Sequence, residues 1–191
     1  MTAHRLLLLT ALAICLTAQA REYSVKSPDG SIVFSISLNE AGSPVYAVTA
    51  AGKAVIDPSV TGFAATPDAA PAYSSLKKEG GLKKVRAEWK PLWGKRAIVA
   101  DRYNARTFHL DGSFPATLEV RVYDDGAAFR FTGLPAGEMT EQTSFNFAGD
   151  YTAWFYNGER HNIGPEKLSE SDGERLPVMT VKAAEDRFLA I

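Results

Sequence analysis

The sequence predicts an all-β fold, mostly antiparallel and with little helix, of the sandwich or barrel type. Wherever a hydrophobic pattern is visible, it has a period of two residues, which is typical of strands with one buried face. Short clusters of Gly, Pro and Asp separate these patterns, and no long stretch shows a helical period. Many short strands divided by tight turns indicate a sandwich or barrel.

The first expected strands lie in the N-terminal third of the chain. Apolar residues occupy every second position of Ser31–Leu38. The preceding Ser27-Pro28-Asp29-Gly30 has the composition of a tight turn, because Pro fixes φ and Gly accepts a positive φ. Val45–Thr49 and Ala54–Ile56 are the next expected strands, and Ala51-Gly52-Lys53 is predicted to join them as a hairpin.

The clearest hairpin spans Ala116–Leu134. Apolar and polar residues alternate on both sides of Asp124-Asp125-Gly126. An Asp-Gly turn between two such runs is a strong hairpin signal, because both residues tolerate positive φ. Four shorter runs are further strand candidates: Thr107–Leu110, Trp154–Tyr156, Val178–Val181 and Phe188–Ile191.

The N-terminus has the three parts of a secretory signal peptide. A positively charged start is followed by an apolar run from Leu6 to Leu16 and by the small-x-small sequence Ala18-Gln19-Ala20. We expect cleavage after Ala20, so that residues 1–20 are the signal and residues 21–191 form one domain. The apolar run is too short to cross a bilayer, which needs about 20 residues.

Cysteine content and charge limit the class of protein further. Cys15 is the one cysteine, so the mature chain is expected to have no disulfide, and lipoprotein processing at Cys15 is an alternative to soluble export. The formal net charge is −1. This balance gives no reason to expect a nucleic acid partner, or a membrane partner after signal cleavage. We interpret Lys77-Lys78 and Lys83-Lys84 as solvated residues of a Gly-containing loop.

No catalytic motif is recognisable, so the candidate residues are binding residues and none is assigned a catalytic role. Trp89 and Trp93 flank a proline and are the most distinctive aromatic pair. Indole rings pack well against the C–H face of a sugar, so the pair could form a sugar platform. The alternative is a plug in the core or at a corner between sheets.

A second candidate region follows the strand Trp154–Tyr156, because polar residues just past a strand end often carry function. Asn157 and His161 could bind sugar hydroxyls there. Glu159 and Glu166 supply the hard oxygen atoms that Ca²⁺ prefers. The alternative is that these side chains are ordinary solvated loop residues.

Four landmarks along the chain resemble the N-terminal domain of glycoside hydrolase family 97, a bacterial α-glucosidase and α-galactosidase family. They cover essentially the whole mature chain in the family's order. They are the turn Ser27–Gly30 with the strand after it, Trp89–Gly94 followed by Asp101–Asn104, the hairpin Tyr123–Phe131, and Lys167–Ser169 before Leu176–Val178.

The resemblance implies a β-super-sandwich, similar to the mutarotase-like sugar-binding domains, that precedes a (β/α)₈ catalytic barrel. The family's catalytic carboxylates lie mainly on that barrel, so we expect this chain alone to be inactive. The resemblance also implies that the domain packs on the barrel, helps to shape the pocket for an oligo- or polysaccharide, and gives one Glu to a Ca²⁺ ion. Glu159 is the best match for this Glu and Glu166 the second. We expect export to the periplasm.

The C-terminal run Asp186–Ile191 is apolar and has no turn or polar tail after it. An exposed apolar edge strand is an aggregation hazard. Either a docked last strand closes the sheet, or the chain is a fragment of a longer protein; we favour the second, since the family's N-terminal domain is longer. The competing functional hypotheses are a stand-alone carbohydrate-binding or adhesin-like sandwich, and a small enzyme of unknown type.

Overall fold

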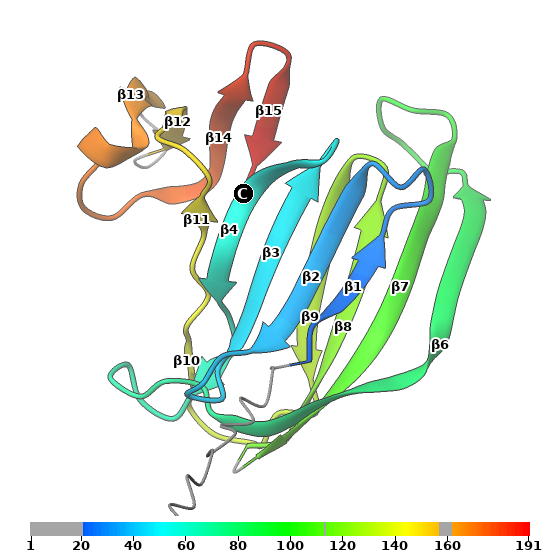
Figure 1. The fold of residues 1–191 in the computed structure, drawn as a ribbon. Coiled ribbons are helices and arrows are strands. Elements are labelled where there is room, and N and C mark those ends of the chain that lie inside the picture. Colours follow the sequence, from blue (N-terminus) through cyan, green and yellow to red (C-terminus); the bar gives the residue numbers. More distant parts are fainter. Residues whose placement is uncertain (1–20, 113, 157–161) are drawn as a thin grey trace, which may run out of the picture.

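The structure, a computed structural model, describes residues 21–112, 114–156 and 162–191. Within these residues the strands are antiparallel, and the one helical element is a short 3₁₀ turn, η1 (Leu168–Glu170). The all-β class expected from the sequence is therefore confirmed. Two large sheets face each other, and a third, smaller sheet rises beside them (Figure 1).

The first sheet is a meander in which consecutive strands are neighbours, with one short strand added from later in the chain. Its strands, in spatial order, are β1 (Tyr23–Lys26), β2 (Ile32–Leu38), β3 (Pro44–Ala50), β4 (Lys53–Val60) and β11 (Asn146–Phe147). The predicted turn before β2 is present, because the Gly30 amide donates to the Ser27 carbonyl at 3.1 Å and Gly30 has a φ of +80°.

The second large sheet is also a meander. Its strands are β6 (Tyr73–Trp89), β7 (Val99–Gly112), β8 (Ala116–Tyr123) and β9 (Gly126–Thr132), in that spatial order. The inner faces of the two meanders form one core, because each presents apolar residues at every second position. The side chains of Phe34, Ile36, Phe108, Leu118 and Val120 are almost completely buried there.

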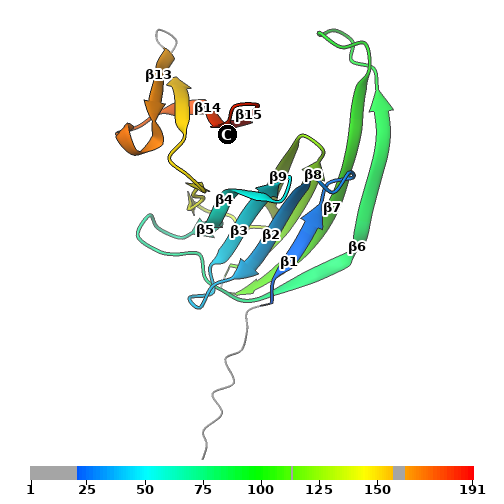
Figure 2. The same ribbon diagram turned by 45° about the horizontal axis from the view of Figure 1, so that its top comes forward.

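The third sheet contains the C-terminal strands and has its own small core of Ala153, Phe155 and Val181. Its strands are β13 (Asn162–Lys167), β12 (Thr152–Tyr156), β14 (Leu176–Ala184) and β15 (Arg187–Ala190) in spatial order. A two-residue ladder of β5 (Phe63–Ala64) with β10 (Thr140–Glu141) forms a separate sheet. Figures 1 and 2 show the third sheet and the far end of the β6–β7 hairpin on opposite sides of the sandwich.

The β8–β9 hairpin is confirmed, but its turn differs from the expected one. Tyr123 pairs with Gly126, so Asp124 and Asp125 are the two turn residues and Gly126 already belongs to the strand. Neither aspartate has a positive φ. The hairpin therefore does not depend on the left-handed conformation that the Asp-Gly signal implies.

The interpretation of Lys77-Lys78 and Lys83-Lys84 as loop residues is wrong. Both pairs lie in β6, which continues from Tyr73 to Trp89 and pairs with β7 along its length. The register shifts between Glu79 and Lys83, around a pair of glycines, so the strand contains a bulge instead of a loop. The lysines are exposed, as expected.

Candidate functional site

The two tryptophans lie at the free end of the β6–β7 hairpin. Trp89 is the last residue of β6, and Trp93 lies in the loop that leads to β7. Their exposed fractions are 55% and 88%. The alternative of a core plug or a corner between sheets is therefore excluded. Exposed indole rings are available for a sugar ring or for an apolar protein surface.

The remaining predicted binding residues belong to the other side of the molecule. Asn157, Glu159 and His161 lie outside the described residues. Tyr156 ends β12 before them and Asn162 begins β13 after them, both in the third sheet. Figure 2 places this sheet opposite the free end of the hairpin. The structure thus does not bring the tryptophans next to the strand ends that frame Asn157 and His161.

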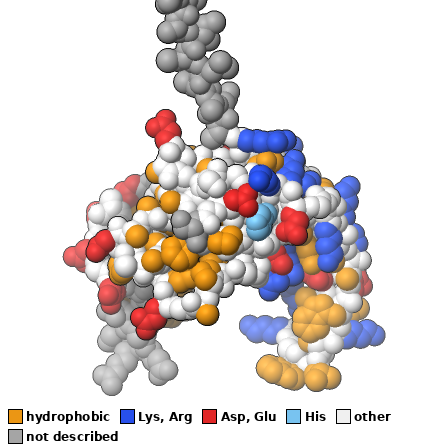
Figure 3. Space-filling view, turned by 90° about the horizontal axis from the view of Figure 1, so that it is seen from below, with side chains coloured by type: hydrophobic (Ala, Val, Ile, Leu, Met, Phe, Trp, Pro, Cys, Tyr) orange, Lys and Arg blue, Asp and Glu red, His pale blue; other side chains and the backbone are white. Residues whose placement is uncertain are grey.

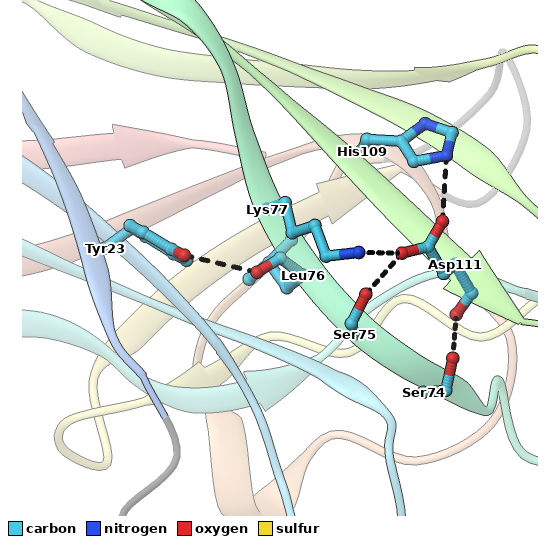
Figure 4. Close-up of polar contacts among 7 residues, drawn as sticks. All are labelled: Tyr23, Ser74, Ser75, Leu76, Lys77, His109 and Asp111. Atoms are coloured by element: carbon cyan, nitrogen blue, oxygen red, sulfur yellow. Dashed lines mark hydrogen bonds and ion pairs between the residues drawn. The ribbon is translucent and has the colours of Figure 1, made fainter.

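A polar cluster that sequence reasoning missed lies on the outer face of β6 and β7, around Asp111 (Figure 4). The Lys77 Nζ donates to Asp111 Oδ2 at 2.8 Å, and the Ser75 hydroxyl donates to the same oxygen. His109 Nε2 lies 3.1 Å from Asp111 Oδ1. The signal was present in the sequence, because Ser75 and Lys77, and likewise His109 and Asp111, are two positions apart and so share a strand face.

This cluster joins the outer faces of the neighbouring strands β6 and β7 and does not form a nucleophilic site. The carboxylate of Asp111 lies between the serine and the histidine, and the Ser75 proton is directed at the carboxylate. An activated serine needs the reverse order, with the imidazole receiving the hydroxyl proton. The hydrogen bonds from Lys77 and Ser75 lower the pKa of Asp111 from 3.8 to about 2.

The lowered pKa predicts a stability difference with a defined pH window. Since Asp111 binds its proton more weakly in the folded state, it stabilises the fold above about pH 4, and this contribution disappears as the pH falls towards 2. Asp111→Asn should unfold at lower urea concentration than wild type at pH 7, and the gap should close between pH 4 and pH 2. Asp172→Asn, which changes a fully exposed carboxylate, serves as the control. A gap that is unchanged at pH 2 would contradict the assignment.

Two of the cavities in the described part of the molecule bear on a possible active site, and neither is lined by the tryptophans. One, of about 390 Å³, lies beside the start of β6 and is lined partly by polar groups, among them Arg21, Asn39 and Glu40. The other, of about 350 Å³, lies between β2–β4 and β15 and has a mainly apolar lining that includes Phe34, Tyr46 and Phe188. Glycoside hydrolysis generally requires two positioned carboxyl groups. The first cavity is lined by a single carboxylate, Glu40, and the second by Asp125 alone.

The comparison with known families decides the identity of this β-rich chain. The sequence model of the family described as Glycosyl-hydrolase 97 N-terminal matches residues 25–185. The chain belongs to this family. The match covers most of the residues in both large sheets and in the third sheet, so the resemblance drawn from the four sequence landmarks is confirmed for the whole fold.

Solved structures of several enzymes, some of them described as family 97 members, show the same fold. A Glycoside Hydrolase Family 97 enzyme from Pseudoalteromonas sp. strain K8 in complex with panose is 28% identical with a TM-score of 0.57, and the match covers 70% of this chain. A complex of such an enzyme with acarbose is 26% identical with a TM-score of 0.55. A β-arabinopyranosidase is also 26% identical, with a TM-score of 0.56. The match spans 22% of each of these longer chains.

Glu166, the second candidate for the family 97 calcium ligand, lies on β13 next to Arg175. The Arg175 Nη2 is 3.8 Å from Glu166 Oε1, and that oxygen is buried without a hydrogen bond. A guanidinium at this position competes with a cation for the carboxylate. Moreover, no group of three or more His, Cys, Asp or Glu side chains suited to a metal occurs among the described residues. Within the described residues Glu166 is thus paired with a guanidinium, and its assignment as a calcium ligand stays a prediction.

Over residues 21–112, 114–156 and 162–191, no helix is long and apolar enough to cross a bilayer.

Proposed function

We propose that this chain is the N-terminal domain of an exported glycoside hydrolase of the α-glucosidase or α-galactosidase type. In this proposal the domain packs on a (β/α)₈ catalytic barrel and completes its active site for an oligo- or polysaccharide. The observation that carries the proposal is the family match over residues 25–185, together with related enzymes in which the matching region is only 22% of the chain. The rest of such an enzyme is large enough to hold the chemistry.

The sugar contact is assigned to the region after β12. Tyr156 at the end of this strand is exposed, and Asn157 and His161 supply amide and imidazole groups that can bond to hydroxyls. Pseudoalteromonas family 97 enzymes have been solved with panose and with acarbose, which supports a carbohydrate as the ligand class. Residues 1–20 have the composition of an export signal, which is consistent with a substrate outside the cytoplasm.

The absence of activity in the isolated domain is the first test. Purified residues 21–191 should not hydrolyse aryl α-glucosides or α-galactosides, because the carboxyl pair is proposed to lie on the barrel. The DNA that follows codon 191 should encode the catalytic domain, and the joined product should hydrolyse one of these substrates. Turnover by residues 21–191 that is lost when a carboxylate is replaced would contradict the proposal. A stop codon with no catalytic reading frame beside it would favour a stand-alone carbohydrate-binding sandwich.

The calcium ion implied by the resemblance stays a prediction, with Glu159 as its first candidate ligand and Glu166 as the second. Calcium at millimolar concentration should raise the melting temperature of residues 21–191, because binding to the folded state stabilises it. The shift should be lost in Glu159→Gln and kept in Glu166→Gln. A shift lost in Glu166→Gln would show that Arg175 yields to the metal and would contradict the assignment, as would no shift in wild type.

A further inference from the structure

The distal part of the β6–β7 hairpin is here called the arm and defined as residues 83–102; from Arg86 to Arg102 it extends beyond the last residue of β7 that pairs with β8. β7 pairs with β8 only between Tyr103 and Leu110, so the segment from Val99 to Arg102 is bonded to β6 alone. In the arm every residue of β6 except Val85 is exposed, and in β7 Ala100 and Arg102 are exposed while Val99 and Asp101 are partly buried. An isolated two-stranded hairpin is marginally stable in water, so an arm of this length needs a partner that covers it.

The end of the arm is apolar. Leu92 is completely exposed and Trp93 is 88% exposed, and Trp89 and Ile98 are more than half exposed. Four large apolar side chains around one loop are more than the scattered exposure that an ordinary surface shows. Trp is also among the residues that contribute most to binding at protein interfaces. The loop therefore has the composition of an anchor.

The arm is also strongly cationic, in contrast to the rest of the chain. It has seven Lys and Arg residues and two acidic residues, whereas the remainder of the chain has fourteen basic and twenty acidic residues. Arg102 pairs with Glu88 within the arm. Lys90, Lys95 and Arg96 form no ion pair within the described residues. Figure 3 shows blue Lys and Arg side chains around an orange apolar end at the lower right of the molecule.

We propose that the arm is the element by which this domain docks on the catalytic part of its enzyme. Trp93 and Leu92 would enter an apolar recess, and acidic side chains on the rim of that recess would meet Lys90, Lys95 and Arg96. The inference rests on the proposed function and deepens it, because it names the contact surface and the charge of its partner. It reassigns Trp89 and Trp93 from a sugar platform to a protein interface.

A protein partner agrees better with the structure than a membrane does. A hairpin that inserts into a bilayer needs apolar and basic residues only at its end. In this arm, exposed and positively charged residues occur along the strands as far as Lys83, Lys84 and Arg102. A partner can cover these residues only by lying along the arm. The related enzymes also contain a large part that this chain does not match, because the match spans 22% of their length.

Binding of residues 21–191 to the separately expressed catalytic domain, encoded after codon 191, tests this docking by biolayer interferometry. Leu92→Ser with Trp93→Ser should weaken binding about 30-fold or more, since the loss of Trp93 alone as an anchor costs about 2 kcal/mol or more. Lys90→Glu with Lys95→Glu and Arg96→Glu should slow association, most strongly at low salt. Lys53→Glu on β4 and Phe114→Ser, at the opposite end of β7 from the arm, are the matched controls. Thermal unfolding checks that every variant is folded.

The outcomes separate the inference from the function on which it rests. Loss of binding in the arm variants alone supports the docking arm. Equal binding by wild type and arm variants overturns the inference and leaves the proposed function standing. No binding by wild type contradicts the proposed function itself. Wild type is also tested for binding to panose and to vesicles of phosphatidylcholine with 30% phosphatidylserine. If the Leu92 and Trp93 changes abolish such binding but leave docking unchanged, the arm has a sugar or membrane role and the inference is overturned.

Discussion

Replacing Phe108 by alanine should lower the free energy of unfolding of the domain by about 3–5 kcal/mol. Phe108 lies on the inner face of β7, is completely buried, and has its ring centroid 5.4 Å from that of Tyr23 in the opposite sheet. It is flanked by Lys78 of β6 and Leu118 of β8. The removed ring joins the two meanders, so its loss leaves a cavity that neither rigid sheet can close.

Urea denaturation of residues 21–191 measures this effect. Phe188→Ala is the matched control, because it is the same change at a ring that is 56% exposed on β15. This change should lower the free energy of unfolding by about 1 kcal/mol or less. Most of that loss would come from the contact with Trp154, whose ring centroid lies 6.4 Å from that of Phe188. If both variants lost the same stability, the two meanders would not share the core described here.

Gly42→Ala should destabilise the domain by about 2–5 kcal/mol in total, more than an equivalent change at Gly52. Both glycines have positive φ, +81° at Gly42 and +74° at Gly52, so an added Cβ costs about 1–2 kcal/mol in backbone strain at each. At Gly42 the new Cβ would also lie 2.5 Å from the backbone oxygen of Tyr73. At Gly52 it would meet nothing within 4 Å.

The difference in stability between the two glycine variants measures the effect of the close approach between the β2–β3 turn and the start of β6. The Tyr73 amide donates to the Gly42 carbonyl at 2.8 Å, so the β2–β3 turn fixes the first residue of β6. Relieving the contact would require this turn or the start of β6 to move, at an overpacking cost of about 1–3 kcal/mol. Melting temperatures and urea midpoints of Gly42→Ala and Gly52→Ala test it. Equal losses would show that the turn and β6 separate freely.

The hydrophobic pattern predicted the strands that have one buried face. Leu118, Val120 and Val122 alternate with polar residues and are completely buried, so the β8–β9 hairpin could be located from the sequence. The longest strand, β6, could not be located in this way. Most of its residues are exposed on both faces, and backbone hydrogen bonds to β7, which leave no hydrophobic pattern, hold it in place.

The candidate sites show the same limit. Sequence marked Trp89 and Trp93 as unusual but could not separate a buried plug from an exposed end, because both use the same residues. The sequence marked Glu166 as a candidate metal ligand but could not predict that Arg175 lies 3.8 Å from it, a contact made by the path of the chain around η1 and into β14. Strand periodicity cannot predict such a contact, since the residues between Glu166 and Arg175 do not form one strand.

The consecutive order of strands within each meander sets a time course for folding during synthesis. The β1–β4 meander is complete when residue 60 is available, but the strands that cover its apolar face end at residue 132. At about 5–20 residues per second, Phe34, Ile36 and Tyr46 stay uncovered for about 4–14 seconds. During that interval the nascent chain presents the kind of surface that holding chaperones bind, and the arrival of β8 and β9 would release it.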